Sequence, residues 1–262
     1  MPFRENPISA VMIVKDELHH LKRNLPRLEF CDEIVVVDSG STDGSVEFAE
    51  SLGCRVLHRA FDGYGTQKAF AVDQARFDWV VNVDADEYLP EPVVREIEEL
   101  ISDPPAGLNA IFLRSRLHFL GREFRFGRES GYSVLRVFRK SCGNFDRSPV
   151  HERVVIADLK AVTLASAYEH HSYPSIEHYV DKMNRYTSAG AAAVFRRHSW
   201  CPARLRALLF PFKFIQFYFL QLNFLNGWPG FVWSVLSCHA FFIKYVKVFT
   251  LQSEEGGMGW LC

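Results

Sequence analysis

Short apolar runs alternate with mixed segments over the first hundred residues. Three runs rich in β-branched residues and a weaker fourth predict strands. They lie at Ile8–Val14, Ile34–Val37, Arg55–His58 (the weaker one) and Trp79–Val83. Helical patterns lie between them, at Leu18–Leu28, Ser45–Leu52 and Thr66–Ala75. Repeated strand–helix units with continuously apolar strands predict a parallel sheet that helices cover on both faces.

Acidic residues follow three of these strands. Glu17, Asp38 and the pair Asp84 and Asp86 all fall where a strand ends. In open parallel sheets, ligands bind beyond the carboxyl ends of the strands. A carboxylate is costly to bury without a partner, and carboxylates suit Mg²⁺ or Mn²⁺. The pattern therefore favours a cation or polar ligand at this edge. The alternative is an acidic turn that begins the helix at Glu91.

The segment 109–172 has a different character. Strand candidates at Ala110–Leu113 and Val134–Phe138 flank an arginine-rich stretch, and further strands are expected at Arg153–Ile156 and Ala161–Ala167. We therefore expect one domain over residues 1–175, in two parts that meet near residue 105.

Residues 176–262 form an aromatic and basic extension that we expect to be helical. From Lys182 to Ser253 there are nine Lys or Arg residues and no Asp or Glu, although the whole chain has a net charge of −1. Polar residues interrupt the apolar runs Leu208–Phe224 and Phe231–Phe249, so we expect no spanning helix. Aromatic faces with basic flanks favour helices that lie in a membrane interface. A helical cap on the catalytic domain, or a dimer interface, is the alternative.

Six cysteines are scattered without a C-x-x-C pair, which favours neither a zinc ribbon nor a disulfide framework. The N-terminus has no secretory apolar region. We therefore expect a reduced, cytoplasmic protein. Basic and aromatic residues also occur in nucleic-acid-binding proteins, but the sequence contains no recognised motif of that kind and we expect no nucleic-acid partner.

Three motifs together carry a family resemblance. Ile13–Glu17, Val36–Asp43 and Asp84–Glu87 resemble those of family 2 inverting glycosyltransferases, which have the Rossmann-like GT-A fold. Within that family, the chain is more similar to the lipopolysaccharide core β-1,4-glucosyltransferases. The matching features there are Gly63–Lys68, Val150–Glu152 and Gly227–Phe231. The resemblance extends over roughly residues 8 to 250. It implies a GT-A nucleotide-sugar-binding catalytic domain over residues 1–175, with a nucleotide-binding half over about 8–105 and an acceptor half over about 106–175. It also implies a membrane-peripheral extension on the cytoplasmic face of the inner membrane.

The resemblance implies roles for residues that match its motifs. Val14 and Glu17 would line the nucleotide pocket, and Asp38 would bind the uracil or the ribose. Lys68 would lie near the diphosphate. From the residues alone, Asp38 could instead stabilise a turn, and Lys68 could instead be a solvated helix residue.

The same resemblance places Asp84 on the ribose side and gives Asp86 the divalent cation, Mg²⁺ or Mn²⁺. A histidine after the last strand can complete such a metal site. Adjacent histidines cannot both face one side of a strand, and we favour His171. The chain departs from the family pattern at Asp16 and Ala69, where asparagine is frequent. Both departures bear on the finer assignments.

Inverting transfer needs a base that takes the proton of the acceptor hydroxyl. Glu152 is the expected base and Asp146 the second choice. The alternative for Glu152 is a strand-edge acid paired with Arg147 or Arg153. The sequence thus predicts transfer of a sugar, from UDP-glucose by resemblance, to a lipid-linked core saccharide in lipopolysaccharide or lipooligosaccharide synthesis.

Three other functions are alternatives. The first is transfer to polyprenyl phosphate or to a protein. The second is a sugar nucleotidyltransferase, but Lys15-Asp16-Glu17 does not form the glycine-rich loop typical of that class. The third is an inactive membrane-binding module, against which the acidic strand ends argue.

Overall fold

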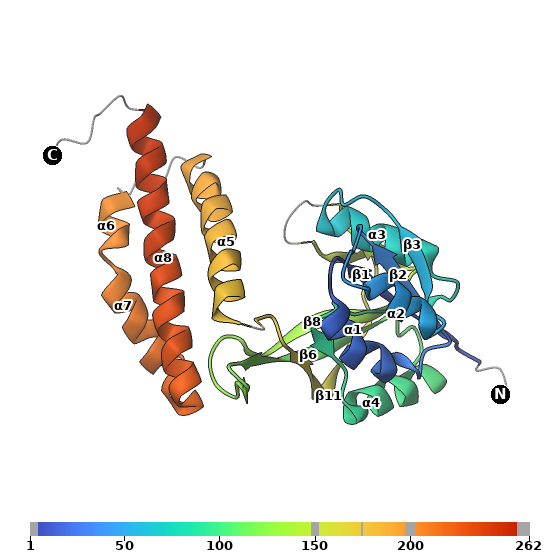
Figure 1. Cartoon of the computed structure of the whole chain (residues 1–262). Coiled ribbons are helices and arrows are strands. Elements are labelled where there is room, and N and C mark those ends of the chain that lie inside the picture. Colours follow the sequence, from blue (N-terminus) through green and yellow to red (C-terminus); the bar gives the residue numbers. More distant parts are fainter. Residues whose placement is uncertain (1–4, 148–151, 174, 197–202, 256–262) are drawn as a thin grey trace. The chain divides into compact units, whose positions relative to one another are not determined.

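The structure is a computed structural model that describes residues 5–147, 152–173, 175–196 and 203–255. The chain divides into two compact units (Figure 1). The first comprises Met1–Arg116 and Gly131–His170, and the second comprises Leu117–Ser130 and His171–Cys262. The segment 117–130, expected in the acceptor half, thus groups with the helical extension. The functional boundary at residue 175 stays a prediction.

The predicted α/β organisation is confirmed in the first unit. Its sheet begins in the order β3-β2-β1-β4, with β1 parallel to both β2 and β4. The strands of the chain are β1 Ile8–Val14, β2 Glu33–Asp38, β3 Arg55–His58, β4 Trp79–Asn82, β5 Glu87–Tyr88, β6 Ala110–Phe119, β7 Arg122–Glu123, β8 Ser130–Arg139, β9 Gly143–Phe145, β10 Val154–Ile156 and β11 Ala161–His170. The helices of this unit are α1 Leu18–Asn24, η1 Leu25–Leu28, α2 Ser45–Ser51, α3 Tyr64–Gln74 and α4 Glu91–Ser102.

The sheet continues with strands from the second half of the catalytic segment. The order runs on as β4-β8-β6-β11-β5, and both β4–β8 and β11–β5 are antiparallel pairs. A small ribbon of β9 and β10 stands apart from this sheet. The sheet is therefore mixed. As a result, residues of β8, more than fifty positions later in the chain, lie beside β4.

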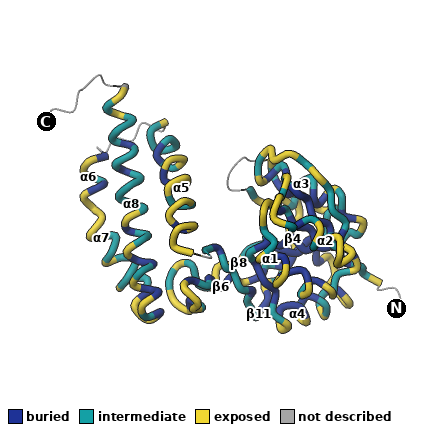
Figure 2. Tube along the Cα trace, viewed as in Figure 1, coloured by how far each residue is buried: buried dark blue, intermediate teal, exposed yellow. Residues whose placement is uncertain are grey.

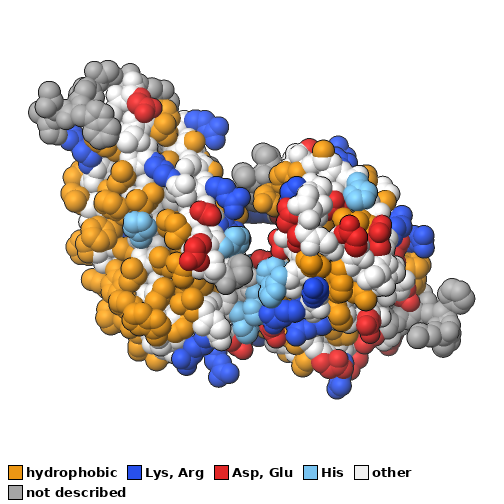
Figure 3. Space-filling view, viewed as in Figure 1, with side chains coloured by type: hydrophobic (Ala, Val, Ile, Leu, Met, Phe, Trp, Pro, Cys, Tyr) orange, Lys and Arg blue, Asp and Glu red, His pale blue; other side chains and the backbone are white. Residues whose placement is uncertain are grey.

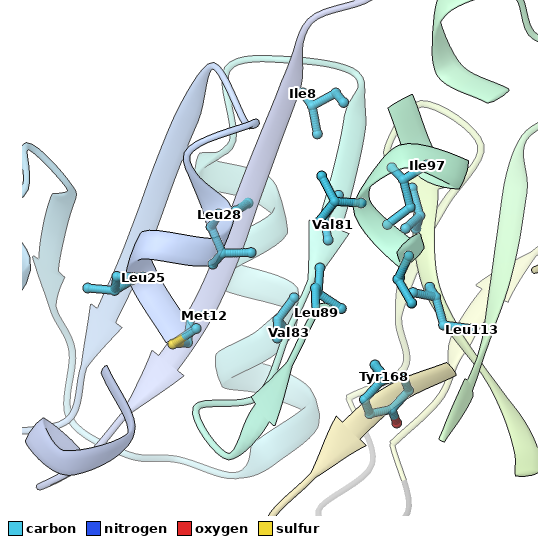
Figure 4. Packing of buried hydrophobic residues seen from close by; sticks show 14 of the residues in the cluster. Ile8, Met12, Leu25, Leu28, Val81, Val83, Leu89, Ile97, Leu113 and Tyr168 are labelled. Atoms are coloured by element: carbon cyan, nitrogen blue, oxygen red, sulfur yellow. The ribbon is translucent and has the colours of Figure 1, made fainter. Parts of the chain in front are cut away.

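Both faces of β1, β2 and β4 are buried, as the continuous apolar strands predict (Figure 2). Along β1, Ala10, Met12 and Val14 belong to one core cluster, whereas Val11 belongs to the cluster on the other side. This alternation follows from the two-residue period of a strand. Figure 4 shows part of the first cluster, in which Leu25 and Leu28 of η1 are among the labelled core residues.

The second unit is mainly helical. Its helices are α5 Ile176–Arg196, α6 Ala203–Ala207, α7 Phe210–Ile215, the π-helical turn η2 Gln216–Leu220, η3 Asn223–Asn226 and α8 Trp228–Glu255. Helix α8 packs against α5, α6 and α7. A Cβ on Gly230 would lie 1.9 Å from the carbonyl oxygen of Asn223, so only glycine fits where η3 turns into α8. This gives the tail motif Gly227–Phe231 a structural role.

Large apolar side chains are exposed along the segment from Leu205 to Val235. Leu208, Phe212, Leu220 and Trp228 are each at least 67% exposed. Figure 3 shows hydrophobic side chains gathered over this unit. By length and composition alone, Trp228–Glu254 is apolar enough to cross a membrane. That finding differs from the expectation drawn from the shorter run at 231–249. An interfacial position of the helix stays a prediction.

Candidate active site

The loops after β1 and β2 are joined by hydrogen bonds at the carboxyl edge of the sheet. The Asp16 carboxylate accepts the N–H of Thr42 at 2.7 Å, and the Ser41 hydroxyl accepts the N–H of Asp16 at 2.8 Å. Asp16 has a φ of +54°, a left-handed conformation that Asn and Asp adopt more readily than most residues. Aspartate therefore fits the backbone conformation that this position adopts.

Val14 and Glu17 lie on either side of this loop junction. Val14 is buried at the end of β1, in register with Asp38 of β2. The backbone N–H of Glu17 donates to the Ser45 hydroxyl at 3.0 Å, while its side chain is 37% exposed and lies 4.0 Å from His20. The structure thus brings both residues to the expected edge. Their contact with a nucleotide stays a prediction.

Asp38 has a structural role that its sequence context left open. Its side chain is almost fully buried and accepts N–H groups from Gly40 at 2.8 Å and Ser41 at 3.1 Å. His58 Nδ1 lies 3.2 Å from the same carboxylate. Burial would raise the pKa of Asp38, but hydrogen bonds from Ser41, Gly40 and His58 lower it. The carboxylate therefore stays charged and fixes the turn.

Asp84 is held by two cations at the end of β4. Its Oδ1 lies 2.8 Å from Lys68 Nζ and its Oδ2 lies 2.9 Å from Arg136 Nη2. Burial would raise the pKa of Asp84, but Lys68 and Arg136 together hold it well below its usual range. Both oxygens of this carboxylate are therefore engaged by protein groups.

Arg136 belongs to a buried cluster that sequence reasoning missed. Its guanidinium also donates to Glu87, whose carboxylate accepts the Tyr168 hydroxyl at 2.9 Å. Arg136 and Glu87 are each at most 9% exposed. The only sequence signal was an arginine inside the apolar run Val134–Phe138. An ionised residue in a buried strand needs a partner, and here Asp84 and Glu87 are the partners.

Lys68 joins the expected base to the expected donor site. Its ammonium lies 2.9 Å from Glu152 Oε1 as well as 2.8 Å from Asp84, and the residue is only 5% exposed. Burial would lower the pKa of Lys68 and Arg136 opposes its charge, but Asp84 and Glu152 raise the pKa above its ordinary value. Lys68 is therefore a buried, charged bridge and no solvated helix residue.

Asp146, the second candidate base, lies in a different setting. Its carboxylate accepts the backbone N–H of Arg153 at 3.0 Å, and its own N–H donates to the Arg153 carbonyl at 2.8 Å. Asp146 thus pairs with Arg153 next to the paired strands β9 and β10. Among the described residues, the cation that pairs with Glu152 is Lys68, whereas the alternative weighed from the sequence named Arg147 or Arg153.

Asp86 lies beside a histidine, but the neighbour is His170. The Asp86 Oδ2 atom is 3.5 Å from His170 Nε2, and the two side chains are about one-fifth exposed. Burial would lower the pKa of His170, but its hydrogen bond to Asp86 raises it. His171, the histidine we expected here, belongs to the second unit and stacks on His118 with ring centroids 4.4 Å apart. The structure therefore favours His170 over His171 as the partner of Asp86.

Hydrogen bonds from the Asn24 side chain fix the turn that carries Asp84 and Asp86. The Asn24 side-chain amide donates to the carbonyl oxygens of Asp84, Ala85 and Glu87 at 3.2, 3.1 and 2.7 Å. An accessible carboxylate beside an imidazole, on a rigid turn, fits a divalent cation that also takes phosphate oxygens. Asp86 and His170 thus offer a carboxylate and an imidazole at this turn, and a cation bound there stays a prediction.

Comparison with known proteins decides the family. Residues 9–153 match the description "Glycosyl transferase family 2". The chain belongs to this family. An uncharacterized glycosyltransferase of Rickettsia bellii is 31% identical over 258 residues, which cover 94% of this chain and 87% of the relative. The order β3-β2-β1-β4, followed by antiparallel strands, gives the first unit the GT-A fold.

A second relative carries a more specific name. The lipopolysaccharide core biosynthesis glycosyltransferase LpsC of Rhizobium meliloti is 28% identical over 93% of this chain and 92% of its own length. Among solved structures, S. aureus TarS (residues 1–349) in complex with UDP aligns with a TM-score of 0.47 and 15% identity. That alignment covers 97% of this chain and 93% of TarS.

Proposed function

We propose that this glycosyltransferase moves a sugar, with inversion, from a nucleotide diphosphate to a hydroxyl of a lipid-linked core saccharide. The proposed donor is UDP-glucose and the proposed process is lipopolysaccharide or lipooligosaccharide synthesis. Membership of the family supports a nucleotide-sugar donor. The likeness to LpsC over nearly the whole chain supports the lipopolysaccharide core as the acceptor class.

The observation that carries the proposal is the bridge made by Lys68. One buried ammonium contacts both Asp84, at the end of β4, and Glu152, which precedes β10. Lys68 thus pairs with both Asp84, on the donor side, and Glu152, the candidate base. A sugar bound at the strand ends would have Glu152 within reach of its acceptor.

The chemistry needs one base. The acceptor oxygen attacks the anomeric carbon as the bond from that carbon to the diphosphate breaks, and the diphosphate leaves with the bonding electrons. Glu152 takes the hydroxyl proton, and the configuration at the anomeric carbon inverts in this single displacement. A second carboxylate nucleophile, as in retaining glycoside hydrolases, is not required.

The chain's own residues divide the remaining work. Asp38 and Glu17 line the nucleotide side, and Asp84 orients Lys68 toward Glu152. Asp86 and His170 would hold the divalent cation. When bound, this cation supplies positive charge to the leaving diphosphate. Mg²⁺ and Mn²⁺ both suit a carboxylate with phosphate oxygens.

The helical unit supports a lipid-linked acceptor. The exposed apolar side chains from Leu205 to Val235 lie in a stretch that contains no acidic residue. Apolar area and basic residues both favour an anionic membrane surface. We therefore propose that the protein is peripheral on the cytoplasmic face of the inner membrane, where lipid-linked saccharide would be its substrate.

The test is Glu152→Gln, with transfer from UDP-glucose to purified core acceptor measured by mass spectrometry. This change keeps the size of the side chain and its oxygen near Lys68, but an amide cannot take the proton. The rate should fall by about 10²–10⁴. UDP binding, measured by calorimetry, should be unchanged because Glu152 does not contact the nucleotide in this proposal.

Asp146→Asn is the matched control, since it removes one carboxylate charge from the same loop without touching Lys68. It should retain most of the activity. An inactive Asp146→Asn with an active Glu152→Gln would move the base to Asp146. Full activity of both variants on the core acceptor would contradict both base assignments. Wild-type transfer to polyprenyl phosphate but not to the core acceptor, with no loss in Glu152→Gln, would contradict the hydroxyl acceptor, because a phosphate needs no strong base.

A further inference from the structure

A cavity of about 340 Å³ lies between α5 and α8, wholly within the second unit. Cavities of roughly 300–1,000 Å³ are typical of small-molecule sites. The proposed chemistry of the first unit uses none of its lining residues. The cavity is therefore separate from the candidate active site.

Two lysines line this cavity, Lys182 from α5 and Lys244 from α8. Over the part of the chain that the structure describes, neither ammonium forms an ion pair with a carboxylate. Aromatic rings hold them instead, with Lys182 Nζ 5.2 Å from the Tyr173 centroid and Lys244 Nζ 4.9 Å from the Tyr245 centroid. Cation–π contacts orient an ammonium without neutralising it. The cavity thus presents two positive charges that attract an anion.

The stem of Lys244 depends on the helix opposite. A Cβ on Gly190 of α5 would lie 3.2 Å from Lys244 Cδ, which is tighter than ordinary packing. The bare backbone at Gly190 therefore leaves room for this lysine to lie across α5. The position of the positive charge is thus built into the packing of the two helices.

The rest of the lining combines aromatic rings with hydroxyl groups. Tyr173, Tyr179 and Tyr186 contribute both, and Thr187 and Ser237 add further hydroxyls. Of the eleven lining residues, Met183 and Ala240 are the aliphatic ones. An acyl chain would favour aliphatic walls. Flat rings beside hydroxyl groups suit a ligand with one apolar face and polar edges, as a pyranose has.

We propose that this cavity binds an anionic sugar, namely a saccharide unit that carries a phosphate or a carboxylate. The rings of Tyr173 and Tyr186 pack on the sugar, and Lys182 and Lys244 pair with its negative group. The inference rests on the proposed function only in naming the lipid-linked acceptor as the source of that sugar. Binding by itself does not depend on transfer.

Calorimetry on the full chain tests the site, with glucose 6-phosphate and glucuronic acid as anionic probes. Glucose, inorganic phosphate and dodecyl phosphate serve as comparisons. Both anionic sugars should bind more tightly than glucose or phosphate. Lys182→Gln and Lys244→Gln should each weaken that binding by about tenfold or more, because each removes one charge-assisted contact. Tyr186→Leu should also weaken it, since leucine keeps apolar area but loses the ring and hydroxyl.

Arg185→Gln is the matched control, because Arg185 is an exposed cation of α5 that does not line the cavity. It should leave sugar binding unchanged. Equal binding of glucose and glucose 6-phosphate, or equal effects of Lys182→Gln and Arg185→Gln, would overturn the proposal. Lysine-dependent binding of dodecyl phosphate without binding of either anionic sugar would assign the cavity to lipid and overturn it as well.

A second arm separates this proposal from the proposed function. It uses phosphorylated core oligosaccharide freed of lipid, before and after phosphatase treatment. Phosphate-dependent binding, lost in Lys244→Gln, supports the site even if the enzyme transfers no sugar to that acceptor. Binding that is indifferent to phosphatase contradicts the site even if transfer is observed.

Discussion

Replacement of Lys68 by methionine tests whether the buried bridge is the electrostatic centre of the site. Methionine keeps the length and apolar stem of the side chain but removes the ammonium. Asp84 would keep Arg136 at 2.9 Å, whereas Glu152 would lose the only cation paired with it among the described residues. We therefore expect a destabilised first unit whose deficit comes mainly from Glu152.

The magnitude follows from the two short contacts. At 2.8 and 2.9 Å, with an effective dielectric constant of about 20, each ion pair has a Coulomb energy of about 6 kcal/mol before desolvation. Lys68 is buried, but the side chains of Asp84 and Glu152 are 29% and 19% exposed, so desolvation and solvent screening offset most of this energy. Removal of one partner from a fully buried pair costs about 3–5 kcal/mol. Because Arg136 still compensates Asp84 and Glu152 is partly solvated, we expect about 2 kcal/mol for Lys68→Met.

The assay is hydrogen–deuterium exchange of peptides from β1 and β4 across a urea series, which reports the first unit alone. Adding Glu152→Gln to Lys68→Met should recover about 1–2 kcal/mol, because the unpaired charge is gone. Lys22→Met, an exposed lysine of α1, is the control and should change stability by less than about 0.5 kcal/mol. A loss for Lys68→Met no larger than that of the control, with additive effects in the double variant, would refute the bridge.

Three further outcomes are expected. Asp86→Asn and His170→Gln should each weaken Mn²⁺ binding about tenfold or more in calorimetry with UDP present, and unchanged binding in His170→Gln would remove His170 from the site. The double variant Phe212→Ser with Leu220→Ser should sediment with anionic vesicles less than the wild type does. High salt should reduce sedimentation of the wild type only partly, because the apolar contribution is not screened. Equal sedimentation of the double variant and the wild type would contradict a membrane-binding surface. Because its pKa is held below the ordinary 3.8, Asp84 should stabilise the fold fully above about pH 5. Unfolding curves of wild type and Asp84→Asn should then converge in acid, and a constant gap down to pH 2 would contradict this.

Local sequence patterns were sufficient for much of the first unit. The strands at Ile8–Val14, Arg55–His58 and Trp79–Val83 were predicted within a residue of β1, β3 and β4, because apolar runs and turn residues act over a few positions. The gathering of acids at one edge also followed from local order, since parallel strands end at the same side of a sheet.

The partners of those acids depended on tertiary structure. Arg136 reaches Asp84 because β8 pairs antiparallel with β4, and Lys68 reaches Glu152 across 84 positions of the chain. Charge alone could not select these pairs, because a buried cation can be satisfied by any carboxylate that the fold brings within reach.

His170 and His171 show most clearly what the local sequence determines and what depends on tertiary structure. The sequence required that His170 and His171 not share one face of a strand, but it could not say which of them faces the site. Pairing of β11 with β5 sets His170 opposite Glu87, next to Asp86. A shift of one residue in that pairing would exchange the two side chains. The alternation is a property of the local backbone, whereas the register is set by contacts between segments some eighty residues apart.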